Sequence, residues 1–576
     1  MAILRRFCVL VVFLVPVLAP AQSEDEKLRE KQLRQARVTQ QVIADIPNFK
    51  LGGNRAYIYA KAGSLIWKTD QKLAGDLFRR AVTELINAQS VAEGARKSTP
   101  NNELLTGQGP RHQILNAIAI YDAEFALDSL YRTRPAAVER AISSRAYAQN
   151  KSGSSYGYNN FHLAQNELNL EQQFLRRAAE QNPNRAAGLL KESLKKGLSN
   201  ETIEALKKLH SIDPGVAKEL ADEVVAKLVG KNFIAGNQPD HNLIQLSTMI
   251  LSDFIRERQP NEKALKFDDL SIKSLADKLI AFHLETAPRY GNYYFQSIIP
   301  IAEKLAPGTV KRLKSLERSN PHRGWGNDPD VQKLMQENPT ADKLIAEAKR
   351  FPVENRSQIY QTAANKMSDA GDYAGALALL NDNFSDEALE NAVNSLNWYY
   401  AHHLMNQQKF SEAERLIDEF PDNNRIVALI QLANTVFNKN NIENKAYALS
   451  LLGKARSQLS DTLGNSNELT QYSQLITAYG GIEPAEAFRM SEPLMPQLNE
   501  LCEASIIVQA FQGAQNIQQG EMLIVNGAHF GFYLDVNVFQ KLAEIDFERT
   551  INLIETFSRR EMRVYLKLVL AESIAN

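Results

Sequence analysis

Apolar residues recur every three or four positions along almost the whole chain. Over residues 70–86 this spacing gathers Leu73 and Leu77 on one face and sets Lys72 and Arg79 on the other, as in an amphipathic helix. The same period predicts helices over residues 114–130, 161–179, 202–209, 216–229, 243–255, 272–284, 359–367 and 425–437. The alternation typical of strands is almost absent, its best example being 522–525 with 529–538. The pattern predicts an all-α fold with little or no β-structure.

Short breaks separate the predicted helices, and two longer polar stretches interrupt them. The first stretch covers residues 151–160, and the second, 319–340, contains three prolines and two glycines. No helical period survives in the second stretch until Ala341, so we expect a domain boundary there. The expected organisation is an N-terminal helical-repeat region over 22–320 and a C-terminal one over 341–576. Gly (28) and Pro (21) are scarce, which also argues against an all-β chain.

A segment of six residues repeats along the chain. Phe-Pro-Val-Glu-Asn-Arg, ending at Arg356, returns 69 residues later as Phe-Pro-Asp-Asn-Asn-Arg, ending at Arg425. A weaker copy ends at Arg563, a further 138 residues on, and a copy with a four-residue insertion ends at Arg55. A period of 69 is twice about 34, the length of one helical hairpin in a solenoid.

A second pattern lies inside the repeat. Tyr373 and Phe410 are each followed three positions later by alanine, Ala376 and Ala413, and then by large apolar residues. Alanine permits two antiparallel helices to approach closely where they cross, while the aromatic ring fills the space at the turn. These positions are therefore expected to serve the packing of helical hairpins.

Here the sequence resembles the tetratricopeptide repeat family. Trp398, Ala401, Ala413 and Pro421 match that family's Trp, the small-residue region of its first helix, its second-helix Ala and its closing Pro. The resemblance implies an α-solenoid of stacked antiparallel helical hairpins, a superhelix whose concave surface binds other proteins, and no catalytic residues. Stacked hairpins share a continuous core and leave polar terminal units.

The first 21 residues have the three parts of a secretory signal peptide. Two arginines precede an apolar run over 7–18, and Ala-Pro-Ala at 19–21 supplies small residues for cleavage. The run has 12 residues, whereas an anchor helix needs about 20, and no later segment is apolar enough to span a bilayer. We expect an exported protein, periplasmic or extracellular. Cys502 would then be the single remaining cysteine, and we expect it to be buried rather than reactive.

Charge and motifs exclude several classes of function. Lys and Arg number 66 against 67 Asp and Glu, so the chain lacks the basic field of a nucleic-acid-binding protein. The sequence contains no phosphate loop, dinucleotide-binding motif, nucleophile elbow or zinc-binding helix, and we expect no cofactor, metal or catalytic residue. The adjacent His402 and His403 point about 100° apart on a helix, which disfavours a shared metal. We expect one packed and one solvated histidine.

Three loops rich in aromatic and polar residues are candidate binding surfaces, because rigid aromatics near amides or arginine are enriched at binding hot spots. The alternative is that each loop closes a hairpin and packs on the next repeat. The candidate binding residues are Tyr156, Tyr158, Tyr290, Tyr293, Tyr294, Arg323 and Trp325.

The recurring arginines are open to two interpretations. Arg55, Arg356, Arg425 and Arg563 could line a concave face and hold acidic partners, or each could bond a carbonyl or carboxylate of the neighbouring hairpin. Recurrence favours the structural role, because every hairpin must pack against its neighbour in the same way.

Two functions remain open at this stage. The favoured one is a non-enzymatic, exported helical-repeat protein that binds another protein or peptide, or scaffolds an assembly in the cell envelope. The alternative is a secreted all-helical enzyme, of the α/α-toroid or lytic type, acting on polysaccharide or cell-wall material. An open curved stack would favour binding, whereas a closed ring around paired carboxylates would favour catalysis.

Overall fold

The computed structural model describes residues 24–94, 109–143, 155–235, 238–256, 265–290, 295–318, 329–439, 444–514, 516–524, 532 and 534–575. The predicted signal peptide, residues 1–21, lies outside them and stays a prediction. Within the described residues nearly every element is a helix, and the strands form two antiparallel pairs in which each strand has two residues. The all-α prediction is therefore confirmed.

The elements of the first half run as follows. They are α1 (Glu24–Asp45), η1 (Ile46–Asn48), α2 (Gly52–Ile66), α3 (Gln71–Gly94), α4 (Pro110–Ala119), α5 (Ala123–Arg132), α6 (Ala136–Ser143), α7 (Ser155–Gln181), α8 (Pro183–Lys196), α9 (Glu201–His210), α10 (Pro214–Gly230), β1 (Ile234–Ala235), β2 (Gln238–Pro239), α11 (His241–Ile255), α12 (Asp269–Tyr290), α13 (Phe295–Leu305), η3 (Pro307–Thr309) and α14 (Val310–Arg318).

The second half continues with shorter helices. They are α15 (Pro329–Gln336), α16 (Ala341–Ala348), α17 (Val353–Asp369), α18 (Tyr373–Asn383), α19 (Asp386–Asn406), α20 (Phe410–Asp418), α21 (Asp422–Lys439), α22 (Lys445–Arg456), α23 (Ser466–Ile482), α24 (Pro484–Ser491), α25 (Leu494–Phe511), β3 (Ile517–Gln518), β4 (Glu521–Met522), α26 (Asn537–Ile545), α27 (Phe547–Glu555) and α28 (Arg560–Ala575).

Three local predictions are wrong. The helix expected over 114–130 is two helices, α4 and α5, because Asp122 caps a new helix by accepting a hydrogen bond from the Phe125 backbone N–H at 2.9 Å. The polar stretch 151–160 already contains the start of α7 at Ser155. Helix α15 lies within 319–340, before Ala341, since Pro329 suits a first helical position. The domain boundary itself stays a prediction.

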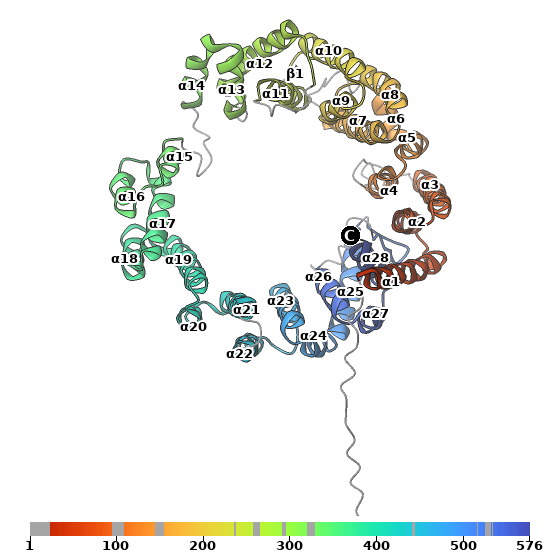
Figure 1. Cartoon of the computed structure of the whole chain (residues 1–576). Coiled ribbons are helices and arrows are strands. Elements are labelled where there is room, and N and C mark those ends of the chain that lie inside the picture. The colour runs from red at the N-terminus through yellow and green to blue at the C-terminus, as the bar shows by residue number, and fades with distance from the viewer. Residues whose placement is uncertain are drawn as a thin grey trace, which may run out of the picture.

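The helices form two layers arranged around a ring (Figure 1). Helices α17, α19, α21 and α23 lie on the inner side, and α16, α18, α20, α22 and α24 lie outside them. Successive pairs such as α17 and α18, or α21 and α22, contact each other as hairpins, and each inner helix also contacts the next. The fold is an α-solenoid of stacked helical hairpins, as the repeat predicted.

The two ends of the described chain meet, which the sequence did not predict. Helix α1 packs along α28, with Val38 and Val42 completely buried (Figure 1). The prediction of polar terminal units is wrong, because each end covers the apolar face of the other. The first turns of α1 are exposed, but the helix enters the core from Val38 onward.

Polar contacts fasten this junction. The buried carboxylate of Glu521 accepts hydrogen bonds from the backbone N–H groups of Lys50, at 2.7 Å, and Leu51, at 2.9 Å. The Asn54 side chain donates to the Met522 carbonyl at 2.9 Å and accepts from the Ile524 N–H at 3.0 Å. We call these contacts the terminal clasp.

The core runs through the clasp rather than through the middle of the chain. Buried apolar side chains from Val38 to Leu313 and from Ala401 to Ala571 belong to one connected cluster. Between them, α15 to α18 and the first part of α19, up to Leu396, rest on two small separate clusters, one around Ile359 and one around Leu396. The helices are therefore most continuously packed where the first and last segments of the described chain meet.

Candidate binding surface

The seven candidate binding residues, or their side chains, lie outside the part of the chain that the structure describes. Tyr293, Tyr294, Arg323 and Trp325 lie outside the described residues. Tyr156, Tyr158 and Tyr290 fall in the first turn of α7 and the last turn of α12, and their side chains are not described. A role for these seven residues stays a prediction.

The four recurring arginines make the same contact. Arg356 donates to the Phe351 carbonyl at 2.9 Å, and Arg425 donates to the Phe420 carbonyl at 2.7 Å. The equivalent contacts of Arg55 and Arg563 go to the carbonyls of Phe49 and Phe557. In each case an arginine near the start of a helix bonds the phenylalanine carbonyl of the turn that precedes it.

The hairpin turns inside the repeat are also equivalent. Gly371 and Gln408 both adopt positive φ, at 88° and 61°, and each is followed by the start of the second helix of its pair. Ala376 and Ala413 are fully buried on those second helices. Because alanine occupies the crossing, the two helices approach closely there.

The exposed sides of the inner helices are almost free of charge in the middle of the stack. On α21 the buried side chains occupy one arc and the partly exposed ones the other, and the latter include Asn424, Gln431 and Asn434. On α23 the corresponding arc carries Asn467, Thr470, Gln474 and Thr477. Since the buried arcs pack against the outer layer, these arcs face the inside of the ring.

The pattern extends to the two preceding inner helices. Helix α17 exposes Gln358, Gln361, Thr362 and Asn365 along one side. Helix α19 exposes Asn391, Ser395, Tyr399, His402 and Asn406 at the same helical spacing, and its first turns also expose Asp386, Glu387 and Glu390. We call the amide and hydroxyl residues of these four arcs the inner amide surface; they are Gln358, Gln361, Thr362, Asn365, Asn391, Ser395, Asn406, Asn424, Gln431, Asn434, Asn467, Thr470, Gln474 and Thr477.

Two amide oxygens beneath this surface lack a hydrogen-bond partner. The side-chain carbonyl oxygens of Gln431 and Gln474 are themselves buried, although both residues are partly exposed, and neither oxygen has a partner within the described structure. An amide oxygen without a partner is costly unless water or a ligand satisfies it. The two residues lie on neighbouring inner helices, α21 and α23.

The outer helices have the opposite character. On α20 the charged residues Glu414 and Asp418 both pair with Lys454 of α22, at 3.2 and 2.5 Å. On α24, Glu486 and Arg489 form an ion pair within the helix. Charge in this half of the molecule therefore gathers on the outside of the stack.

A fixed aromatic group borders the inner amide surface. Asp369, at the end of α17, accepts a hydrogen bond from the Tyr399 hydroxyl at 2.7 Å and contacts His403 Nδ1 at 2.9 Å. The bond to Asp369 raises the pKa of Tyr399. With Nδ1 donating to Asp369, His403 Nε2 accepts from the Gln407 amide, while His402 is exposed. The two histidines therefore have separate surroundings.

The first half contains a buried ionic cluster that sequence reasoning missed. Glu167 on α7 accepts from Arg111 through both carboxylate oxygens, at 2.8 and 3.0 Å, and from Arg134 at 3.0 Å. One turn later, Glu171 binds Lys196 at 2.7 Å. Burial alone would raise the pKa of Glu167, but the charges of Arg111 and Arg134 outweigh it and lower that pKa. These carboxylates are committed to ion pairs.

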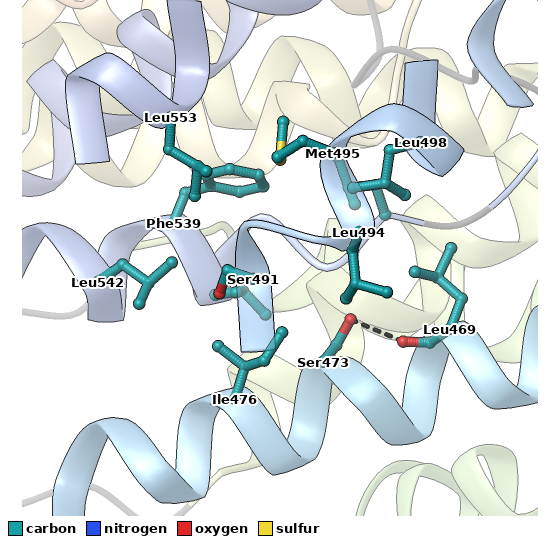
Figure 2. Close-up of a pocket in the computed structure, with 12 residues that line it drawn as sticks. Leu469, Ser473, Ile476, Ser491, Leu494, Met495, Leu498, Phe539, Leu542 and Leu553 are labelled. Carbon is teal, nitrogen blue, oxygen red and sulfur yellow. Dashed lines mark hydrogen bonds between the residues drawn. The ribbon is translucent and has the colours of Figure 1, made fainter. Parts of the chain in front are cut away.

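One apolar cavity lies between α23, α24, α25 and α26 (Figure 2). Its volume is about 20 Å³, and most of its lining is leucine and other apolar side chains. The hydroxyls of Ser473 and Ser491 already donate to carbonyls of their own helices, at 2.9 and 2.7 Å. A space of this size holds at most one water and offers it few free partners. It is a packing gap rather than a substrate site.

The predicted inertness of Cys502 agrees with its surroundings. The thiol is buried on α25, and burial raises its pKa to about 12. Elsewhere in the described segments, no three His, Cys, Asp or Glu side chains are grouped so that they could hold a metal ion. A bilayer-spanning helix, judged by length and apolar content, is not found among those segments either.

Comparisons with known proteins identify no relative by sequence. No family model matches the chain, and neither does any curated protein. Among solved structures, the chain is similar to a circular tandem repeat protein with a novel repeat topology and enhanced subunit contact surfaces. That match has 13% identity, covers 92% of this chain and 98% of the other, and has a TM-score of 0.12. At that TM-score the backbones do not superpose, so the fold is established by the helices described above.

Proposed function

We propose that this protein is an exported, non-enzymatic scaffold of the cell envelope that holds another polypeptide against its inner amide surface. The observation that carries the proposal is the row of amide and hydroxyl side chains on four consecutive inner helices, α17, α19, α21 and α23. Hydrogen-bonding groups on a concave surface provide many weak contacts to a partner lying along the stack. The predicted signal peptide supports export.

The alternative, a toroidal enzyme acting on polysaccharide, shares the ring shape but needs an available acid and base. Among the buried carboxylates, Glu167 and Glu171 are occupied by Arg111, Arg134 and Lys196, while Glu521 and Glu561 accept hydrogen bonds from backbone N–H groups at the terminal clasp. A carboxylate held in this way is a poor proton donor at neutral pH, because its charged form is favoured. This arrangement supports the scaffold over the enzyme.

Site-specific cross-linking in the producing cell tests the proposal. A photoreactive residue replaces Gln431 on the inner helix α21, and a matched one replaces the exposed Ser450 on the outer helix α22. We expect a discrete polypeptide adduct in the envelope fraction from position 431 and none from position 450. Equal labelling from both positions, or adducts that are glycan rather than polypeptide, would contradict the proposed function.

A further inference from the structure

We infer that helix α25 is a dimer interface, through which two copies of this chain pack antiparallel along an exposed apolar face. This interface is separate from the inner amide surface and goes beyond the proposed function. The inference follows from the exposure, the spacing and the charge of the side chains on α25.

The exposed side of α25 is apolar over its last three turns. Phe511 is 93% exposed, the highest value for a large apolar side chain among the described residues, and Ile507 and Val508 are 67% and 52% exposed. Leu501 and Ala504 continue this face toward the start of the helix. Single exposed apolar residues are common on soluble proteins, but a contiguous group marks an interaction surface. We call these five residues the α25 seam.

The remainder of α25 is anchored, so the seam is held in a fixed position. The Asn499 side chain donates to the Thr556 carbonyl at 2.9 Å and accepts from the Ser558 backbone N–H at 2.8 Å. Glu503 pairs with Arg559 at 2.9 Å. These contacts hold α25 against the turn between α27 and α28, and the seam is therefore presented on a rigid helix.

The spacing of the seam suits a second copy of the same helix. Leu501, Ala504, Val508 and Phe511 follow the alternating three- and four-residue steps of a coiled-coil heptad. In an antiparallel pair of such helices, Leu501 lies opposite Phe511 of the second copy, and Ala504 lies opposite Val508 of the second copy. Because the pairing is reciprocal, one helix supplies both halves of a closed interface.

The charges on α25 favour the antiparallel arrangement. Glu500 and Glu503 are the charged residues of this helix, and both precede Ala504. A parallel pair would bring four carboxylates together, whereas an antiparallel pair places them near Gln509 and Gln512 of the second copy. The helix contains no Lys or Arg, which a membrane-binding amphipathic helix carries on its polar face. A second copy therefore fits the seam better than a bilayer.

Sedimentation velocity on the chain without its predicted signal peptide, residues 22–576, tests the inference. One helix pair is at the low end of interface sizes, so we expect reversible dimers with a dissociation constant of roughly 1–100 µM. Phe511→Asp places a carboxylate opposite Leu501 and should weaken the dimer at least about tenfold. The matched control, Leu270→Asp, changes a side chain that is 77% exposed on α12 and should leave dimerisation unaltered. A monomer at every concentration, or equal effects of the two variants, would overturn the inference.

Disulfide trapping tests the direction of the pair. In the antiparallel dimer, two copies of Leu501→Cys carry their new thiols ten residues out of register, about 15 Å apart, which is too far for a disulfide. The same holds for two copies of Phe511→Cys. A mixture of the two variants brings unlike positions together, so we expect a disulfide-linked dimer from the mixture alone. The native Cys502 is buried and should add no background. Efficient linking within either variant by itself would contradict antiparallel pairing.

Two further outcomes separate this inference from its alternative and from the proposed function. If the chain floats with phosphatidylcholine vesicles while remaining monomeric, and Phe511→Asp abolishes flotation, the seam contacts a membrane and the inference is wrong. If the chain is monomeric but position 431 still yields its polypeptide adduct, this inference fails and the proposed function stands, because α25 is not part of the inner amide surface.

Discussion

The two halves of the ring hold their helices together in different ways. In the first half, α4, α5, α7 and α8 are joined by one buried ionic cluster around Glu167, which has no copy elsewhere in the described chain. In the second half, Arg356, Arg425 and Arg563 repeat one small contact, from the guanidinium to a phenylalanine carbonyl, which the first half makes at Arg55. The first half depends on a single strong group of contacts, and the second on a modest contact used repeatedly.

This difference explains why structural contacts in the second half could be predicted more easily from the sequence. A repeated contact must leave the same residues at a fixed interval, so Arg425 could be assigned a structural role from the 69-residue period alone. A contact made once leaves no interval to detect. Single substitutions in the first half should therefore change the free energy of unfolding by more than those in the second half.

The largest effect is expected at the centre of the ionic cluster. Glu167→Gln leaves the buried Arg111 without its counter-charge and removes one of the carboxylates around Arg134, and we expect a loss of about 3–5 kcal/mol in the free energy of unfolding. Urea denaturation followed by circular dichroism gives the value, and hydrogen exchange in α4 and α7 shows where it arises. The control, Glu192→Gln, breaks an exposed pair with Lys195 and should cause no measurable change. Comparable losses of unfolding free energy in the two variants would mean that the buried ionic cluster contributes no more to stability than an exposed ion pair.

The second effect concerns pH and also belongs to the first half. His283 on α12 is 5% exposed, and burial lowers its pKa to about 4. In the unfolded chain a histidine titrates near 6.5. Between these values the unfolded state binds the additional proton, so stability falls as pH falls, by about 1.6 kcal/mol from pH 6.5 to pH 5.

The variant His283→Gln isolates the contribution of His283 to the pH dependence of stability. It should abolish that part of the pH dependence, measured as the difference between the unfolding free energies of the two proteins at each pH. An unchanged pH profile in His283→Gln would contradict the effect assigned to burial.

The repeated contact should have a smaller and more uniform effect. Arg425→Ala leaves the carbonyl of the buried Phe420 without its donor, and we expect a loss of about 1.5 kcal/mol in unfolding free energy. Arg356→Ala should give a similar value, since it bonds Phe351 in the same way. Arg415→Ala, on an exposed position of the outer helix α20, is the control and should be close to neutral. Unequal losses at positions 356 and 425 would mean that the two contacts are alike only in geometry.

What the sequence could not reveal has a physical cause in each case. The hairpin stack followed from the helical period and from Ala376 and Ala413, because local patterns decide which helices pair. The terminal clasp joins Glu521 to Leu51 across 470 residues, and no local pattern encodes such a contact. The residues of the inner amide surface recur at helical spacing in the sequence. Gln431 and Gln474 belong to one surface only because the stack places helices α21 and α23 next to each other.

The smallest effect compares two equivalent turns and predicts changes of opposite sign. Gly371 has φ of 88° with open space around its Cα, so Gly371→Ala introduces backbone strain and no clash. We expect it to lower the unfolding free energy by about 1 kcal/mol. Gln408 occupies the matching turn at φ of 61°, and there Gln408→Gly relieves the same strain and should raise stability by about 0.5 kcal/mol, net of the entropy that glycine adds to the unfolded chain. Thermal and urea unfolding of the two single variants and the double variant supply the test. Because the turns belong to different hairpins, the two changes should also add in the double variant. If both substitutions shift stability in the same direction, the turns are not equivalent, and the second half is less regular than its repeated arginines indicate.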